Sequence, residues 1–193
     1  MKKLLIAAAL ATAFTGVTAQ ADSVSTESSG TITFNGQLTS STCKVNVNGS
    51  GNSDGNVDLP VLQTSALPKG ATAGDTHFIM QLTDCTLADN KTTVSAFFQH
   101  GTTVNDKGHL INKSDATETS DVTLELLDAN NNNYKSIFIG SDNQKESAIY
   151  KPVTTDGTAT LEYAVRYNAQ EITGAKAAPG MVSSSVVYAL QYK

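Results

Sequence analysis

The sequence contains no tryptophan, only two cysteines and a single arginine, Arg166, among its 193 residues. Its 18 acidic residues outnumber its 13 basic residues and give a net charge of −5 at pH 7. An acidic chain with one arginine lacks the basic surface that attracts nucleic acids and anionic membranes. We therefore expect neither as a binding partner.

One long apolar run lies at the N-terminus and has the features of an export signal. Lys2 and Lys3 form a basic start, the run LLIAAALATAF follows, and an A-x-A cleavage site stands at residues 19–21. Apolar runs elsewhere fall short of the ~18 residues that a membrane-spanning helix needs. The sequence therefore predicts a signal peptide over residues 1–21, followed by a mature chain long enough for one domain.

Export sets the expectation for the two cysteines, Cys43 and Cys85. In an oxidising compartment a disulfide between them is the default pairing, and two free buried thiols are the alternative. A metal site is disfavoured because no histidine or second cysteine lies at ligand spacing to either cysteine. The sequence predicts no metal and no cofactor.

Short runs of alternating polar and apolar residues recur along the mature chain, separated by Gly, Asn, Asp and Pro. Helical periodicity is nearly absent. Regularly spaced short strands are typical of a sandwich or barrel, so we predict an all-β fold. The expected strands are residues 31–38, 43–47, 56–62, 76–83, 92–99, 122–127, 134–139, 158–167 and 181–192.

The two ends of the mature chain do not match an ordinary sheet. The last expected strand has one strongly apolar face and no strand after it, and natural proteins avoid such exposed sheet edges. The first expected strand and the residues before it carry mostly small side chains on one face, with Gly30 in the middle. The N-terminal strand either completes the sheet of its own subunit or, by strand addition, that of the next subunit.

Patterns that resemble catalytic or metal sites are weak. Residues 51–55 spell G-x-S-x-G, but a strand-like run containing proline follows instead of the helix that a hydrolase needs. Residues 128–139 begin like a calcium loop but lack its glycine and its final glutamate. No pair among the three histidines has H-x-x-x-H spacing: His77, His100 and His109. We predict that the protein is not an enzyme.

Four stretches together resemble the pilin subunits that the chaperone–usher pathway assembles, of the type 1 fimbrial kind. They are ITFNGQLTSSTCKV, VDLPVLQTSALPKGATAGDTHFIMQLTDC, GTATLEYAVRYNA and PGMVSSSVVYALQY. The resemblance covers nearly all of the mature chain and includes an aromatic residue, Tyr192, in the next-to-last place.

The resemblance implies an incomplete immunoglobulin-like β-sandwich that lacks its final strand, is held by a Cys43–Cys85 bridge and is completed by a donated strand. It assigns residues 34–193 to the pilin domain. The implied function is that of a structural subunit of a fimbria, polymerised by donor-strand exchange and supporting cell adhesion. The implied partners are other copies of the chain or related pilins, a periplasmic chaperone and an outer-membrane usher. The implied destination is the cell surface, reached through the periplasm.

The resemblance also assigns two sets of residues. Residues 22–33 become the donor-strand extension, whose groove-facing members are Val24, Thr26, Ser28, Gly30 and Ile32. For Gly30, a turn or bulge before the first strand is the alternative to close approach in a partner's groove. The acceptor groove and chaperone contact, including the Lys193 carboxylate, comprise Val182, Val186, Tyr188, Leu190, Tyr192 and Lys193.

The alternative function is that of an exported β-sandwich adhesin or lectin that binds host glycans directly. In the family that the sequence resembles, tip adhesins carry an extra receptor-binding domain at the N-terminus and lack a donor extension. One domain preceded by an extension favours a shaft or adaptor subunit.

Overall fold

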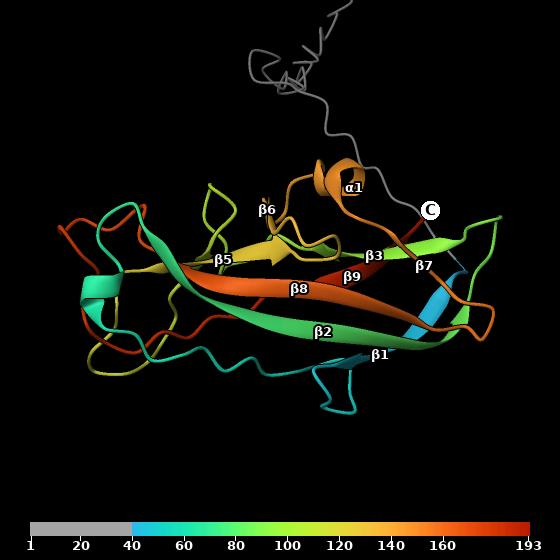
Figure 1. The fold of residues 1–193 in the computed structure, drawn as a ribbon, viewed down its shortest axis with the longest axis horizontal. Helices are drawn as coiled ribbons and strands as arrows, with labels where there is room; N and C mark the ends of the chain where they lie inside the picture. Colours follow the sequence, from blue (N-terminus) through green and yellow to red (C-terminus); the bar gives the residue numbers. More distant parts are fainter. Residues whose placement is uncertain (1–39) are drawn as a thin grey trace, which may run out of the picture. The chain divides into compact units, whose positions relative to one another are not determined.

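The computed structural model describes residues 40–193, which form two antiparallel β-sheets that pack face to face (Figure 1). The larger sheet has the order β1-β2-β8-β5-β4, with β6 also paired to β5, and the smaller has the order β7-β3-β9. This arrangement confirms the predicted all-β fold. The strands are β1 (Thr42–Val47), β2 (Thr72–Thr86), β3 (Thr93–Phe98), β4 (Leu110–Ile111), β5 (Thr123–Asp128), β6 (Lys135–Ile137), β7 (Lys151–Pro152), β8 (Ala159–Asn168) and β9 (Tyr188–Tyr192).

Helical structure within residues 40–193 is limited to a 3₁₀ turn at Thr64–Ala66 and one short helix, α1, at Gln144–Ser147. No helix in this part of the chain is long and apolar enough to cross a membrane.

The core forms because the long strands alternate as the sequence predicts. Side chains of β2 and β8 that point inward are buried, and their neighbours on the outer face are mostly exposed. Strand β3 contributes the opposing layer from the smaller sheet. The central buried side chains are Phe78, Met80, Leu82, Leu161, Tyr163, Val94 and Phe98.

Tyr163 connects the two sheets through both its ring and its hydroxyl. Its ring packs edge-on against Phe98 at 5.0 Å between centroids, and the main-chain N–H of Ala96 on β3 donates to its hydroxyl at 3.0 Å. Burial raises the pKa of Tyr163 to about 12, although hydrogen bonds with Ser95 and Ala96 oppose the shift. The hydroxyl therefore remains protonated and can satisfy a buried main-chain group.

Side chains replace a neighbouring strand on part of the β3 edge that faces away from β9. Strand β7 pairs only with Thr93 and Val94. Further along, the main-chain N–H of Phe98 donates to Gln144 Oε1 at 3.0 Å, and Gln144 Nε2 donates to the Phe98 carbonyl at 2.9 Å. The buried amide of α1 thus imitates one rung of a β-ladder.

Two of the expected strands differ from the structure. Residues 56–62 form no strand, and within 181–192 only Tyr188–Tyr192 does. A strand is defined by hydrogen bonds to a neighbouring strand. Most residues of these two segments have no neighbouring strand within residues 40–193. The expected strand at 31–38 lies outside the described residues, and the short elements β4, β7 and α1 were not anticipated.

Candidate functional site

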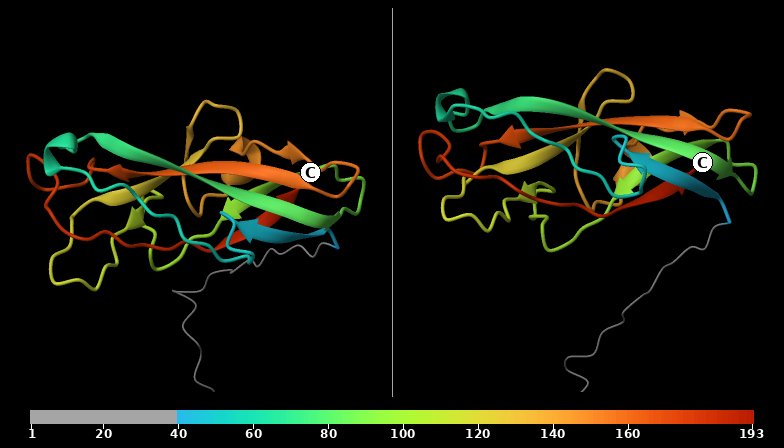
Figure 2. Two further views of the ribbon diagram at one scale, coloured as in Figure 1. Left: turned by 60° about the horizontal axis from the view of Figure 1, so that its bottom comes forward. Right: turned by 90° about the horizontal axis from the view of Figure 1, so that it is seen from below.

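A long groove lies over the hydrophobic core between two segments far apart in the sequence. The groove has a volume of about 890 Å³. One wall comes from residues 53–64 and the other from residues 177–188, which Figure 2 shows in teal and red along the same side of the sandwich. Its floor consists of core side chains from both sheets, including Phe78, Met80, Phe98, Leu124, Leu126 and Val165. A further strand between the two walls would lie directly over these side chains, so the groove has the position of a missing strand.

The wall at residues 177–188 leads into strand β9, which presents an available strand edge. Strand β9 is the last strand of its sheet, so its outer edge has no neighbouring strand among residues 40–193. The main-chain groups of Ser183 and Val187 point away from the groove, toward the rest of the domain. Ser183 N donates to Asn112 Oδ1, and the Val187 carbonyl accepts from Gln99 N. Main-chain groups of successive residues in an extended chain point to opposite sides. The even-numbered residues therefore direct theirs toward the groove.

Three of the six residues predicted for the acceptor groove line it. The three lie along the wall at 177–188, where they are half-buried and pack against the core: Val182, Val186 and Tyr188. Burial, with a smaller contribution from the negative charge of Asp54, raises the pKa of Tyr188. The even-numbered apolar side chains of the last expected strand thus face the core even where no regular strand forms.

The other three residues lie beyond the end of the groove. Leu190 and Tyr192 pack against the same core without lining the groove. A carboxylate oxygen of Lys193 accepts hydrogen bonds from Thr92 N at 2.7 Å, Thr93 N at 2.9 Å and Thr93 Oγ1 at 3.1 Å. The Lys193 ammonium lies 4.3 Å from the centre of the Tyr150 ring, a cation–π contact.

The opposite wall contains residues that the sequence interpretation did not assign to the site. Val57 and Leu59 direct their side chains against the core, whereas Val61 is 99% exposed. The hydroxyl of Tyr167 on β8 donates to the Pro60 carbonyl at 3.1 Å and holds this segment in place. The expected strand at 56–62 was wrong, because these residues form no strand.

The residues predicted to form the donor strand lie outside the described residues, as does the predicted signal peptide. The donor set is Val24, Thr26, Ser28, Gly30 and Ile32. Their role stays a prediction.

A disulfide joins Cys43 on β1 to Cys85 on β2, which confirms the predicted pairing. It closes a loop across 42 positions of the sequence and ties β1 to the larger sheet. The first wall of the groove follows β1 directly, so the disulfide also fixes where that wall begins.

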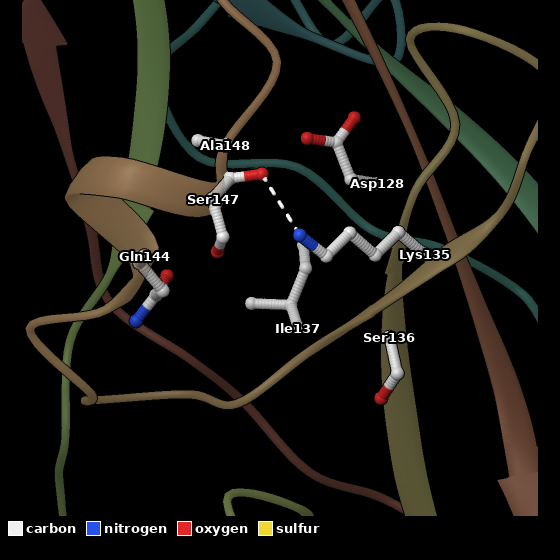
Figure 3. A pocket seen from close by; sticks show the side chains of 7 residues that line it. All are labelled: Asp128, Lys135, Ser136, Ile137, Gln144, Ser147 and Ala148. Carbon is white, nitrogen blue, oxygen red and sulfur yellow. Dashed lines mark hydrogen bonds between the residues drawn. The ribbon is translucent and has the colours of Figure 1, made fainter.

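The calcium-like stretch forms an internal polar network. The carboxylate of Asp128 is buried and accepts hydrogen bonds from Asn130 N, Asn130 Nδ2 and Ile149 N. A neighbouring cavity of about 20 Å³, shown in Figure 3 between Asp128, Lys135 and Gln144, has room for about one water molecule. The carboxylate thus organises the loop before β6 and the start of β7.

The histidines and the G-x-S-x-G stretch are not assembled together. His109 Nδ1 lies 3.0 Å from Glu171 Oε1, and His77 Nε2 lies 3.1 Å from the hydroxyl of Tyr134. Ser53 belongs to the first wall of the groove, where its carbonyl oxygen accepts a hydrogen bond from Tyr188. Among residues 40–193 no group of three or more His, Cys, Asp or Glu side chains is placed to hold a metal ion.

Comparison with known proteins agrees with this geometry. The family model described as "Type-1 fimbrial protein, A" matches residues 59–193. The major fimbrial subunit SMF-1 of Stenotrophomonas maltophilia is 36% identical and aligns with 84% of this chain and 92% of its own length. The type-1 fimbrial protein A chain of Escherichia coli is 29% identical, over 91% of this chain and 90% of its own.

Solved structures show the same fold at low sequence identity. The P pilus rod subunit PapA superimposes with a TM-score of 0.57 at 20% identity, over 78% of this chain and 99% of its own. A chain from a chaperone–usher pilus gives 0.55 at 19% identity, over 88% and 99%. The fold is the incomplete immunoglobulin-like sandwich of pilins. On the family match and the curated relatives, this chain belongs to the type-1 fimbrial protein family and is a structural subunit of a fimbria, a fibre on the cell surface.

Proposed function

We propose that the groove accepts a β-strand donated by another subunit and that this contact links subunits into the fibre. One observation carries the proposal: the segment that leads into β9, as far as Tyr188, borders a groove whose floor is the hydrophobic core and directs alternate main-chain groups toward it. In strand addition, main-chain hydrogen bonds along such an edge provide affinity, and alternate side chains enter apolar pockets. Both requirements are met on the same wall.

The donated strand in this proposal is residues 22–33 of the next copy of the chain or of a related pilin. Its groove-facing side chains are Val24, Thr26, Ser28, Gly30 and Ile32, and its length is similar to that of the wall at 177–188. Glycine lets the donor backbone approach the floor of the groove closely, where a side chain would clash. The pilin domain then comprises residues 34–193, after a signal peptide at 1–21.

A partner must cover the groove before assembly, because an exposed apolar groove and a strand edge invite aggregation. We assign this role to a periplasmic chaperone that lies along the wall at 177–188 and β9. Its contacts in this proposal are Val182, Val186, Tyr188, Leu190, Tyr192 and the carboxylate of Lys193. An outer-membrane usher would replace the chaperone with the next subunit. The role of the chain is structural, without a catalytic step, and it supports adhesion by building the fibre.

The experiment compares two substitutions on opposite faces of the donor segment. Gly30→Leu places a bulky side chain toward the partner's groove and should abolish or strongly shorten fibres. Thr31→Leu adds a similar side chain on the other face and should leave fibre length unchanged. Deletion of residues 22–29 should give a subunit that accepts a strand but cannot donate one, so that added to wild-type subunits it terminates fibres.

Circular dichroism of the purified subunits establishes folding, and electron microscopy gives fibre lengths. Normal fibres from both the Gly30→Leu chain and the deletion would remove residues 22–33 from the assembly mechanism.

A further inference from the structure

The two walls of the groove are joined at one end by a single side chain. The hydroxyl of Tyr188, at the start of β9, donates to the carbonyl of Ser53 on the opposite wall at 2.7 Å. Tyr188 is also the last residue of its wall that lines the groove. Beyond it, the hydroxyl of Tyr192 interacts with the Cys43 main chain on β1. The groove is therefore open along 177–187 and closed from Tyr188 onward.

The Ser53 carbonyl is presented by a loop whose own hydrogen bonds define its shape. Gly51 N donates to Asn46 Oδ1 at 2.9 Å, and Ser50 Oγ donates to the carbonyl of Asp54 at 2.6 Å. Val47 N donates to the Asn52 carbonyl at 3.0 Å. These bonds fix the loop against the end of β1, so Tyr188 meets a prearranged acceptor.

Contact with β1 also prevents the loop from retreating. A Cβ atom added at Gly55 would lie 2.6 Å from Val47 Cγ1 and 2.9 Å from the Val47 carbonyl oxygen. Glycine is therefore required where the chain passes this close to β1. The loop, Val47 and Tyr188 together form the end wall of the groove.

We infer that the Tyr188–Ser53 hydrogen bond is a latch that exists only while the groove is empty and that a donated strand must open. The inference rests on the proposed strand-accepting function. Tyr188 reaches from one wall to the other at that end of the groove. A strand that pairs with β9 beyond Val187 has to displace the tyrosine and separate the Ser53 loop from it.

Removing the hydroxyl should therefore strengthen donor binding. One neutral hydrogen bond contributes a net free energy that corresponds to about a 2- to 10-fold change in an equilibrium constant. Tyr188→Phe keeps the ring and should bind a labelled peptide of residues 22–33 about 2- to 10-fold more tightly than the unaltered chain. The empty Tyr188→Phe subunit should also unfold more readily, whereas its peptide complex should unfold like that of the unaltered chain.

Tyr150→Phe is the matched control, since it removes a hydroxyl that donates to the Lys145 carbonyl and lies outside the groove lining. Its peptide affinity should not change. The measurement is fluorescence anisotropy of the peptide with chains purified from the periplasm.

Unchanged or weaker binding in Tyr188→Phe would overturn the latch. If the peptide fails to bind even the unaltered chain, the proposed strand-accepting function fails, and the latch with it.

Discussion

Replacement of Gln144 by leucine should destabilise the smaller sheet by removing the side chain that completes its edge. Gln144 is 5% exposed and bonds to both the N–H and the carbonyl of Phe98 on β3. Strand β3 is also the strand that holds β9 in the sheet. Gln144 therefore supports, from behind, the edge at which we expect a donated strand to bind.

The magnitude follows from which groups lose their partners. The Phe98 carbonyl keeps a second hydrogen bond, from Gly140 N at 3.0 Å, so its loss is partial. The Phe98 N–H loses the acceptor that the structure gives it, in a residue that is 2% exposed. A buried group left unsatisfied costs ~1–3 kcal/mol, and a typical hydrogen bond contributes ~1 kcal/mol. Gln144→Leu should therefore lower the free energy of unfolding by about 2–4 kcal/mol, a large part of the ~5–15 kcal/mol typical of a domain.

Urea unfolding and amide hydrogen exchange measure this effect at two levels. The urea midpoint should fall, and the Phe98 amide should exchange much faster than in the unaltered chain. Gln81→Leu is the control, because Gln81 is exposed on β2 and its replacement should change stability by less than ~0.5 kcal/mol. Equal urea midpoints for the two variants, with the Phe98 amide still protected, would refute the role given to Gln144.

Two further predictions concern the disulfide and the buried ion pair. Cys43→Ser should lower the free energy of unfolding by roughly 4 kcal/mol, because the bond closes a loop across 42 positions; reduction of the unaltered chain should give the same urea midpoint. Burial alone would raise the pKa of Glu125, but hydrogen bonds from Arg166 and Ser136 and the charge of Arg166 lower it overall. The contribution of Glu125 to stability is therefore present above its unfolded pKa and is lost as pH falls through the lower folded pKa. Arg166→Met should lower the free energy of unfolding by ~3 kcal/mol at pH 7, because it leaves the Glu125 carboxylate buried and without its cation. Burial then raises the pKa of Glu125 in the variant, so this loss should shrink as pH falls toward 4. A difference in unfolding free energy that stays constant between pH 7 and pH 4 would contradict this.

The long strands and the disulfide could be predicted because they depend on local patterns and on compartment. Inward-facing positions of β2 and β8 alternate with period two, so which side chains are buried follows from the residues themselves. The pairing of two cysteines in an exported chain needs no knowledge of the fold. The alternation of 181–192 likewise predicted an apolar face whose members Val182, Val186 and Tyr188 pack against the core.

Contacts between distant segments could not be predicted in this way. Gln144 satisfies Phe98 across 46 positions, and Tyr188 meets Ser53 across 135. Neither pairing leaves a periodic signal, because each depends on how the fold places two elements that are distant in the sequence. The short strand β7 contains Pro152, a residue that argues against a strand except at an edge.

The two strand predictions that differ from the structure lie on the two walls of the groove. Residues 56–62 and the first part of 181–192 have the alternation of strands. Several of their apolar side chains pack against the core, whereas Val61, Met181 and Val187 are exposed. What the two segments lack, within residues 40–193, is a chain between them with which to form a ladder. A side-chain pattern is selected by the packing it makes, whereas a strand also requires a hydrogen-bonded neighbour. Where local pattern and observed structure disagree, a functional site is the expected reason. Here the disagreement between strand-like pattern and missing strand occurs on both walls of one groove. This is expected if the sequence is adapted to a complete sandwich and the completing strand comes from another molecule.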